Sequence, residues 1–239
     1  MNAAAEPVVA IDGPGGVGKT TVSRGVARAL GYQSLDTGAF YRAAALLVRL
    51  HRTDPEDEAA VAAVLSGADL DYRDGVMLVE GVDVSTAIRT ESITAASSRL
   101  ARLPGLRLVL VERQRAWVAV RGGRAVVEGR DIGTVVFPGA AVKVYLDAPP
   151  DVRARRRAGQ TSARLPEVAT QLGRRDRLDS TRATSPLAPA QDAVAIDTHA
   201  LTADQVIARV LDLCRGRGIA PAGGRSGPGT RIRGTGAYS

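Results

Sequence analysis

Val8-Val9-Ala10-Ile11-Asp12-Gly13-Pro14-Gly15-Gly16-Val17-Gly18-Lys19-Thr20-Thr21 is the stretch of sequence that decides the fold. It opens with an apolar, β-branched run of the kind that becomes a buried strand. Its second half fits the phosphate-loop pattern, with four residues between Gly13 and Gly18-Lys19-Thr20. The apolar residues of a helical pattern follow at Val22, Val26, Ala29 and Leu30. This order of strand, glycine-rich loop and helix predicts a nucleotide-binding fold of the P-loop type.

The loop has the chemistry of a triphosphate site. Its glycines allow successive backbone N–H groups to face a phosphate chain, and the start of the next helix adds partial positive charge. In this pattern Lys19 contacts the β- and γ-phosphates, and the Thr20 hydroxyl binds Mg²⁺. We therefore predict binding of ATP with Mg²⁺. The predicted ATP-binding residues of the loop are Gly13, Pro14, Gly15, Gly16, Val17, Gly18, Lys19, Thr20 and Thr21. A glycine-rich turn that binds nothing is the alternative, and the agreement of strand, loop and helix argues against it.

Length and composition are those of a globular protein. The chain has 239 residues, of which 45% are hydrophobic and 24% charged, enough for one full core with a small appended lobe. No apolar run approaches the ~20 residues of a membrane helix, and no secretory signal is visible. The single cysteine, Cys214, excludes an internal disulfide and suits a reducing cytosol. We therefore expect a cytoplasmic protein without membrane contact.

The net charge of +7 is concentrated at the C-terminus. Five arginines and no acidic residue follow Asp212. The segment 216–239 is rich in Gly, Pro and Ser, and we expect it to be a disordered basic tail. A solvated appendage is a better interpretation of it than a nucleic-acid arm, so no stable nucleic-acid binding is expected. Residues 1–6 are expected to be a flexible N-terminus.

Strand and helix patterns alternate along the rest of the chain. Strand patterns lie at 33–35, 125–127, 141–146 and 193–196, and helical patterns at 40–50, 55–67, 92–102 and 104–120. A final helix opens with the capping box Thr202-Ala203-Asp204-Gln205. This alternation predicts an α/β fold, a P-loop NTPase-type parallel sheet flanked by helices. Short strands with Asp-Gly and Glu-Gly turns between 68 and 86 predict a small antiparallel insert, and the arginines of 153–182 predict a lid.

A phosphate loop does not by itself separate switch GTPases, motor ATPases and small-molecule kinases. The only asparagine is Asn2, so the Asn-Lys-x-Asp motif of guanine-specific switches cannot exist. Motor and transport ATPases end a strand in Asp-Glu, whereas Asp131 and Asp147 are followed by apolar residues. The sequence offers no water activator, but it places arginines where strands end. A kinase that acts on a small acceptor is the interpretation that remains.

The arginines indicate that the acceptor is itself a phosphate. A nucleoside monophosphate is a dianion near neutral pH because its second pKa is about 6, so its oxygen attacks without a general base. The obstacle is then the repulsion between two phosphates. A lysine, Mg²⁺ and several guanidinium groups can offset that repulsion and stabilise the developing charge.

At this point the chain resembles the bacterial cytidylate kinase family of P-loop nucleoside monophosphate kinases, over nearly all of residues 7 to 214. The segments that carry the resemblance are 11–14 with the phosphate loop, 35–42, 88–90, 113–115, 129–138, 144–148 and 175–177. The resemblance implies ATP-dependent phosphorylation of CMP and dCMP. We expect a monomer whose partners are ATP, CMP and dCMP. It also implies a kinase domain at 7–215, with a monophosphate-binding lobe at about 37–103 and a lid at about 153–174.

The resemblance further implies roles for single residues. Lys19, Arg130 and Arg182 are the implied catalytic cations, and Arg42 is a further clamp on the acceptor phosphate. Ser98, Arg107 and Asp131 correspond to the group that binds the cytosine edge. The resemblance also implies that other parts of CMP are bound by Thr37, Arg175 and Asp179. It implies that ATP is contacted by Arg156. Residues 153–157 are expected to close over the triphosphate, although the segment 157–174 is shorter than the family pattern.

Two other functions remain open from sequence. A kinase of a hydroxyl acceptor would need a carboxylate base, and Asp12 or Asp36 could serve. A nucleotide-dependent RNA-binding protein would act through the basic tail.

Several other residues are expected to be structural. Asp131 is expected also to cap a helix, and Tyr41 and Trp117 to belong to the core. Arg113 and Arg115 are expected to be surface or structural cations, and Cys214 to be packed.

Overall fold

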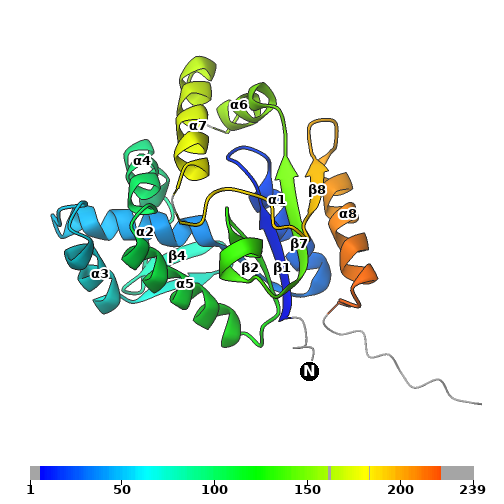
Figure 1. The fold of residues 1–239 in the computed structure, drawn as a ribbon, viewed down its shortest axis with the longest axis horizontal. Coiled ribbons are helices and arrows are strands. Elements are labelled where there is room, and N and C mark those ends of the chain that lie inside the picture. The colour runs from blue at the N-terminus through cyan, green and yellow to red at the C-terminus, as the bar shows by residue number, and fades with distance from the viewer. Residues whose placement is uncertain (1–5, 161–162, 183, 222–239) are drawn as a thin grey trace, which may run out of the picture.

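A parallel sheet forms the middle layer of the protein (Figure 1). The computed structural model describes residues 6–160, 163–182 and 184–221. The five strands run in the order β2 (Gln33–Asp36), β6 (Ala125–Glu128), β1 (Glu6–Asp12), β7 (Ala140–Asp147) and β8 (Val194–Asp197), and all neighbours pair in parallel. The predicted fold class is confirmed. Because β1 is central, the phosphate loop leaves the middle of the sheet's carboxyl edge, where ligands bind in such folds.

Side chains of β1 alternate between two apolar cores. Val8 and Ala10 belong to one buried cluster, and Val9 and Ile11 to the other. This alternation follows from the period of two residues along a strand. Helices α1 (Lys19–Leu30) and α8 (Ala203–Gly216) contribute to the second cluster, whereas α2 (Thr37–Leu50) and α5 (Pro104–Ala119) contribute to the first. The sheet is therefore covered by helices on both faces.

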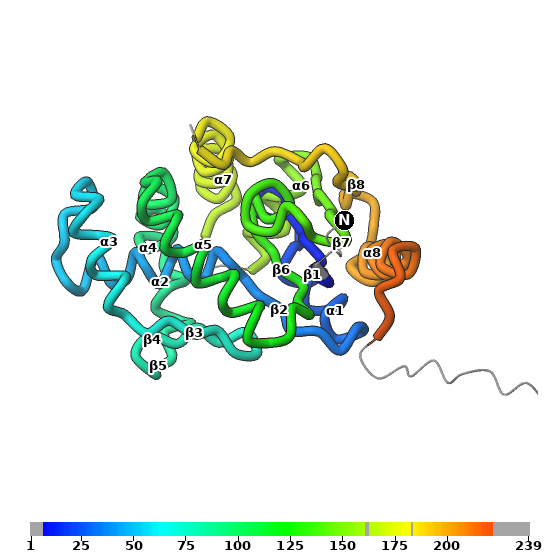
Figure 2. Tube along the Cα trace, turned by 60° about the horizontal axis from the view of Figure 1, so that its bottom comes forward, coloured from blue at the N-terminus to red at the C-terminus, as the bar shows by residue number. Residues whose placement is uncertain are grey.

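A second lobe extends the first core away from the sheet. It contains α3 (Glu58–Gly67), the short helix η1 (Ala87–Arg89), α4 (Glu91–Leu100) and an antiparallel sheet of β3 (Leu70–Arg73), β4 (Val76–Val79) and β5 (Val82–Asp83). Figure 2 shows β3, β4 and β5 beside α2 and apart from the main strands. The predicted antiparallel insert is thus present. Helix α3 begins at Glu58 and not at Pro55, because the Asp57 carboxylate accepts a hydrogen bond from Ala60 N and caps the helix there.

Two helices rise above the carboxyl edge of the sheet. They are α6 (Pro150–Ala158), which follows β7, and α7 (Leu165–Ser180), and they pack against each other (Figure 1). A π-helical turn, η2 (Ile132–Val136), follows β6 at the same edge. Among the described helices, none combines the length and the apolar character that crossing a bilayer requires.

The end of the described chain closes the second core. Helix α8 begins with the predicted capping box, in which Thr202 Oγ1 accepts from Gln205 N. Cys214 is buried as expected, and burial raises the pKa of its thiol to about 11. Ile219 is also buried in this cluster, so ordered packing continues beyond residue 215.

Candidate active site

A cavity of about 650 Å³ lies at the carboxyl edge of the sheet, between the phosphate loop, the second lobe and α7. It brings together most of the residues that the sequence singles out. Those that line it are Gly15, Gly16, Val17, Gly18, Lys19, Thr20, Thr21, Thr37, Arg42, Ser98, Arg107, Arg130, Asp131, Arg156, Arg175, Asp179 and Arg182. Gly13 and Pro14 are not in the cavity wall, but their carbonyl oxygens accept hydrogen bonds from the Lys19 amine.

The phosphate loop is shaped by glycine and by close neighbours. Gly16 has a φ of 81°, and a Cβ there would lie 2.8 Å from the backbone oxygen of Arg153. Gly18 has a φ of 96° at the N-cap of α1. Residues with a side chain rarely adopt this left-handed backbone conformation, so both positions require glycine.

The Lys19 amine is enclosed at the base of the cavity. Its Nζ donates to Gly13 O at 2.8 Å and to Pro14 O at 2.7 Å. Burial lowers the pKa of Lys19, and the charge of Arg130 lowers it further. A triphosphate against this amine would oppose both effects by Coulomb attraction. A bound polyanion would therefore stabilise the charge of this buried amine more than it would stabilise the charge of an exposed lysine.

Glu128 is a functional candidate that the sequence prediction missed. It ends β6, is buried, and accepts hydrogen bonds from Thr20 Oγ1 at 3.1 Å and from Ser23 Oγ at 3.3 Å. Burial raises the pKa of Glu128 to about 7, and the neighbouring charge of Asp36 also raises it. The available signal was a single acid at the end of a buried strand, whereas the prediction looked for an Asp-Glu pair.

The Thr20 hydroxyl and the Glu128 carboxylate suit a magnesium ion. Both are hard oxygen donors that lie against each other in the cavity wall. Mg²⁺ bound to nucleotide phosphates needs one or two such protein ligands, directly or through water. Among the described residues, no group of three or more His, Cys, Asp or Glu side chains forms a metal site. The donors present therefore fit an ion that is held together with phosphate.

Asp179 organises the arginines on the opposite wall. Its carboxylate accepts from Arg130 Nε at 2.8 Å and from Arg182 Nη2, and Arg175 Nε lies 3.9 Å away. Burial opposes ionisation of Asp179, but the charges of the three arginines outweigh it and lower its pKa. One carboxylate thus fixes three guanidinium groups, which leaves the cluster with a net positive charge.

Several of these guanidinium groups have donors to spare. The buried Nε atoms of Arg42, Arg175 and Arg182 have no hydrogen-bond partner within the described part of the chain. Burial lowers the pKa of Arg175 to about 9, and the charge of Arg130 contributes to the shift. Buried donors without partners are costly. All three arginines line the cavity, where their guanidinium groups could donate to oxygen atoms of a phosphate or ribose.

Arg42 reaches the cavity from α2 with its own partner. Its Nη2 donates to Asp36 Oδ2 at 2.8 Å, and both side chains are largely buried. Burial alone would raise the pKa of Asp36, but the charge of Arg42 and its hydrogen bond, together with the charges of Arg89 and Lys19, lower it. Beside this pair, the Thr37 hydroxyl donates to the backbone oxygen of Glu128 at 2.7 Å. The Thr37 bond holds the start of α2 against the end of β6, and the Arg42 bond holds α2 against the end of β2.

Arg107 and Asp131 form a buried ion pair at the far end of the cavity. The Arg107 guanidinium also lies over the ring of Tyr41, 5.7 Å from its centroid. Tyr41 packs against the first core, as expected, and it also lines the cavity. Burial raises the pKa of Tyr41 to about 12, which keeps the phenol neutral. Ser98 Oγ donates to Thr94 O at 3.3 Å and completes this wall.

Asp12, and not Asp131, caps the turn after β6. The Asp12 carboxylate accepts from Ile132 N and from Gly133 N, both at 2.8 Å. Asp131 makes no such capping bond, which corrects the prediction. Burial raises the pKa of Asp12 to about 6, although the two backbone bonds lower it. Since β1 and β6 are neighbours, the carboxylate at the end of β1 reaches these amides, whereas the Asp131 carboxylate is paired with Arg107.

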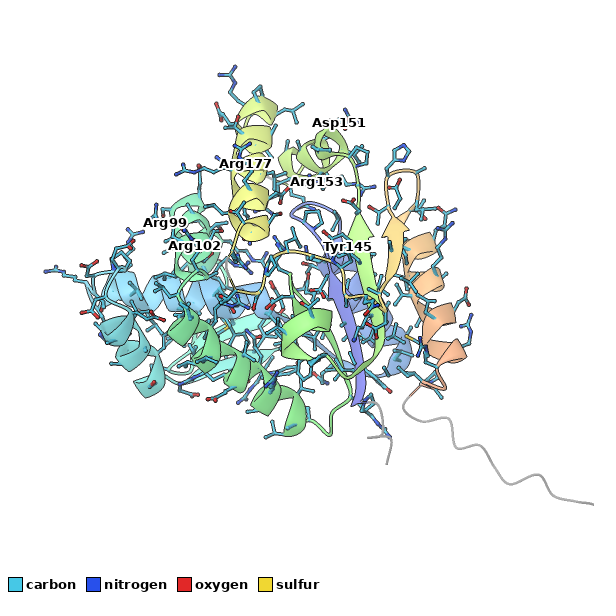
Figure 3. All side chains as sticks on the ribbon, viewed as in Figure 1. Arg99, Arg102, Tyr145, Asp151, Arg153 and Arg177 are labelled. Carbon is cyan, nitrogen blue, oxygen red and sulfur yellow. The ribbon has the colours of Figure 1, made fainter. Side chains whose placement is uncertain are left out.

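The lid arginines separate into two groups. Arg156 and Arg157 line the cavity, whereas Arg153 and Arg155 do not. Figure 3 shows Arg153 between α6 and α7, above the phosphate loop. Arg155 pairs with Asp151 on the exposed side of α6. The expectation that all of 153–157 closes over the triphosphate therefore fails for these two.

Outside the cavity, two further expectations are met. Arg113 donates to backbone oxygens of Leu65 and Ala68, and Arg115 to those of Val135 and Val136, so both are structural cations. Trp117 is buried and donates through Nε1 to Tyr72 O at 2.8 Å.

The sequence prediction missed other members of the cavity wall: Arg89, Thr94, Ser97 and Gln160. Arg89 and Arg157 come from opposite sides, the second lobe and the lid. Arg157 was expected in the lid, whereas Arg89 was considered only as part of the segment 88–90 and was given no role.

The chain matches a known protein family and several of its members. The family model described as cytidylate kinase matches residues 9–216. The chain is 47% identical over 215 residues to a cytidylate kinase of Mycobacterium leprae, covering 88% of this chain and 96% of that protein. It is 48% identical over 222 residues to a cytidylate kinase of Mycobacterium avium, covering 89% and 97%. It is also 44% identical over 237 residues to part of a bifunctional pantoate ligase/cytidylate kinase of Synechococcus elongatus, covering 93% of this chain and 45% of that protein.

Proposed function

The chain belongs to the cytidylate kinase family, and we infer that it transfers the γ-phosphoryl group of ATP to CMP and dCMP. One observation about its own residues supports this function. The phosphate loop with Lys19 and the Asp179-centred arginines line the same cavity. Two anionic substrates can therefore meet end to end between positive groups.

The phosphate loop is assigned to the donor. Its backbone N–H groups and the Lys19 amine would bind the β- and γ-phosphates, and Arg156, which also lines the cavity, would contact another part of ATP. Thr20 and Glu128 would hold Mg²⁺, directly or through water. When bound, the ion neutralises charge on the phosphates. Lys19 contributes a fixed charge at the same position.

The arginine wall is assigned to the acceptor. Arg42, Arg130 and Arg182 would bind the phosphate of CMP, and Arg175 with Asp179 would bind the ribose. Bidentate guanidinium groups hold a phosphate in a fixed orientation, which aligns its oxygen with the γ-phosphorus. Since that oxygen is already ionised, no general base is required.

The Arg107–Asp131 pair is assigned to the base. An ion pair with fixed geometry presents donors from the guanidinium and acceptors from the carboxylate, as the edge of cytosine requires. Uracil reverses the donor and acceptor at two positions of that edge. Buried groups would then remain unpaired, which disfavours UMP. Ser98 and Tyr41 complete the pocket on either side.

A hydroxyl acceptor is less well supported. Of its two candidate bases, Asp12 is occupied by the amides of Ile132 and Gly133, and Asp36 is paired with Arg42. Neither carboxylate is free to remove a proton. Phosphorylation of cytidine, which lacks the phosphate, would support this alternative.

The decisive experiment is a coupled assay with ATP and five acceptors: CMP, dCMP, UMP, AMP and dTMP. We expect turnover with the first two and at least about tenfold lower kcat/KM for the others, as unpaired buried groups demand. Preference for UMP, AMP or dTMP would contradict the assignment of the base site. Omitting Mg²⁺, with a chelator present, should abolish turnover.

We further propose a cytoplasmic monomer that does not bind nucleic acid. The lone buried Cys214 suits a reducing compartment. Deleting residues 222–239 tests the RNA-binding alternative, since the cut spares Ile219 and the second core. The kinase should keep its turnover, and RNA binding by the full chain that is lost on deletion would support the alternative.

A further inference from the structure

Arg153 joins the lid to the phosphate loop. The guanidinium donates from Nε to Ala148 O at 3.0 Å and from Nη1 to Gly15 O at 3.2 Å. The same Nη1 donates to the Asp176 carboxylate, so Arg153 contacts three segments at once. Its side chain is buried beneath α6 (Figure 3). It therefore ties α6, the phosphate loop and α7 together.

Asp176 completes the connection from the side of α7. Its Oδ1 accepts from Gly15 N at 3.4 Å, while Oδ2 accepts from Arg153. Gly15 is thus held through both of its backbone polar groups, the N–H by Asp176 and the C=O by Arg153. Leu172 packs at the same point, since a Cβ on Gly15 would lie 2.8 Å from its Cδ2.

The spacing along α7 connects this contact to the acceptor side. Leu172 lies three and four residues before Arg175 and Asp176, and Asp179 lies four and three residues after them, so the four share one face of the helix. Arg175 and Asp179 line the cavity on the acceptor side, whereas Asp176 contacts the loop on the donor side. One rigid helix therefore touches both sites.

We propose that Asp176 is a positioning residue that, with Arg153, couples the donor site to the acceptor site. It fixes the height of α7 above Gly15, and that height determines where Arg175 and Asp179 meet the acceptor. A triphosphate that displaces the Gly15 backbone changes the hydrogen bonds that Gly15 makes with Asp176 and Arg153. Because Asp176 belongs to α7, the helix then moves. Binding of the two nucleotides is then linked, and the linkage is reciprocal. This inference rests on the proposed function of the cavity.

Calorimetry on the full chain tests the coupling. CMP is titrated alone and in the presence of saturating Mg²⁺ and adenosine 5′-(β,γ-imido)triphosphate, which cannot transfer its phosphoryl group. In the wild type we expect the two Kd values for CMP to differ by about fivefold or more, the lower end of ordinary coupling. Asp176→Asn should bring their ratio to about one, because the neutral amide weakens the bond to Arg153 and the hold on Gly15.

The matched control is Asp151→Asn, which removes an exposed ion pair from the same lid helix without touching the loop. Asp151→Asn should leave the ratio of the two Kd values for CMP as it is in the wild type. If a general loosening of α6 were enough to remove the coupling, this variant would change the ratio as well. If Asp176→Asn is unfolded by circular dichroism, Arg153→Lys replaces it, since one ammonium group cannot reach all three acceptors.

The outcomes separate this inference from the proposed function. Failure of CMP to bind the wild type would contradict the function itself. Wild-type binding with a ratio of one, or a wild-type ratio retained in Asp176→Asn, would overturn the coupling and leave the kinase assignment intact.

Discussion

Asp36 and Glu128 stand directly opposite each other in the register of β2 and β6, at the carboxyl edge of the sheet. Only Asp36 has an arginine partner, Arg42, so the two acids differ in protonation behaviour. The pKa of Asp36 is lowered, whereas burial and the charge of Asp36 raise that of Glu128 to about 7. The edge thus holds one ionised acid and one that takes up a proton near neutrality.

Glu128→Gln should flatten the dependence of stability on pH. Because the folded pKa is raised from 4.5 to about 7, the contribution of Glu128 to the free energy of unfolding is full below pH 4.5. It is lost as the pH rises through about 7. The wild-type Tm, measured without nucleotide, should therefore fall relative to that of Glu128→Gln over this interval, by about 2–4 °C for each kcal/mol. Glu112→Gln, an exposed substitution on α5, should follow the wild type; parallel curves for all three proteins would refute the assignment.

Asp12→Asn should weaken the placement of Arg130 and Asp131. The amide can accept at one oxygen only, so one of the N–H groups of Ile132 and Gly133 loses its partner. An unsatisfied buried group costs about 1–3 kcal/mol, which urea unfolding would measure. Since the turn follows Asp131 directly, KM for CMP should rise more than KM for ATP. Equal changes in both would show that Asp12 acts on stability alone.

Lys19→Ala and Asp131→Ala should affect different kinetic constants. Loss of the amine removes charge stabilisation from the transferring phosphoryl group, and we expect kcat to fall about 10²–10³-fold. Loss of Asp131 removes acceptors for the base and leaves Arg107 without its partner. The ratio of kcat/KM for CMP over UMP should fall by about tenfold or more. The reverse pattern would exchange the two roles.

Gly15→Ala should interfere with the approach of α7. The new methyl group would lie 2.8 Å from Leu172 Cδ2 and 3.8 Å from Arg130 Nη2. A displacement of about 1 Å at a reacting group can cost about 10²-fold in rate, so kcat should fall by up to that factor. Leu172→Ala in the same chain should restore much of the loss, because it makes room. Gly173→Ala, where a Cβ meets nothing, is the control and should retain activity.

The fold and the donor side of the cavity could be predicted from local signals, whereas the acceptor-side residues followed from the family resemblance. The phosphate loop is a continuous motif, and the insert with its Asp-Gly and Glu-Gly turns follows a period of two residues. The cap on the turn after β6 was assigned wrongly because Asp12 reaches it across 120 positions of sequence, through the pairing of β1 with β6. No local pattern contains that information.

The roles of the arginines of α6 also could not be predicted from the local sequence. Arg153, Arg155 and Arg156 are nearly consecutive, yet one contacts the loop, one is exposed and one lines the cavity. Their directions follow from the turn of α6 and from the position of α7, which a composition rich in arginine does not reveal. Glu128 was missed for a different reason, since its sequence signal is a single residue.

The described chain begins and ends on the side of the sheet opposite to the cavity, where β1 starts and α8 finishes (Figure 1). A protein or a solid support attached beside Glu6 or Pro221, the two ends of the described chain, would lie on that side and leave the cavity facing the solution. The enzyme can therefore be joined to a second catalyst, or fixed in a flow reactor, without narrowing the route by which its substrates arrive.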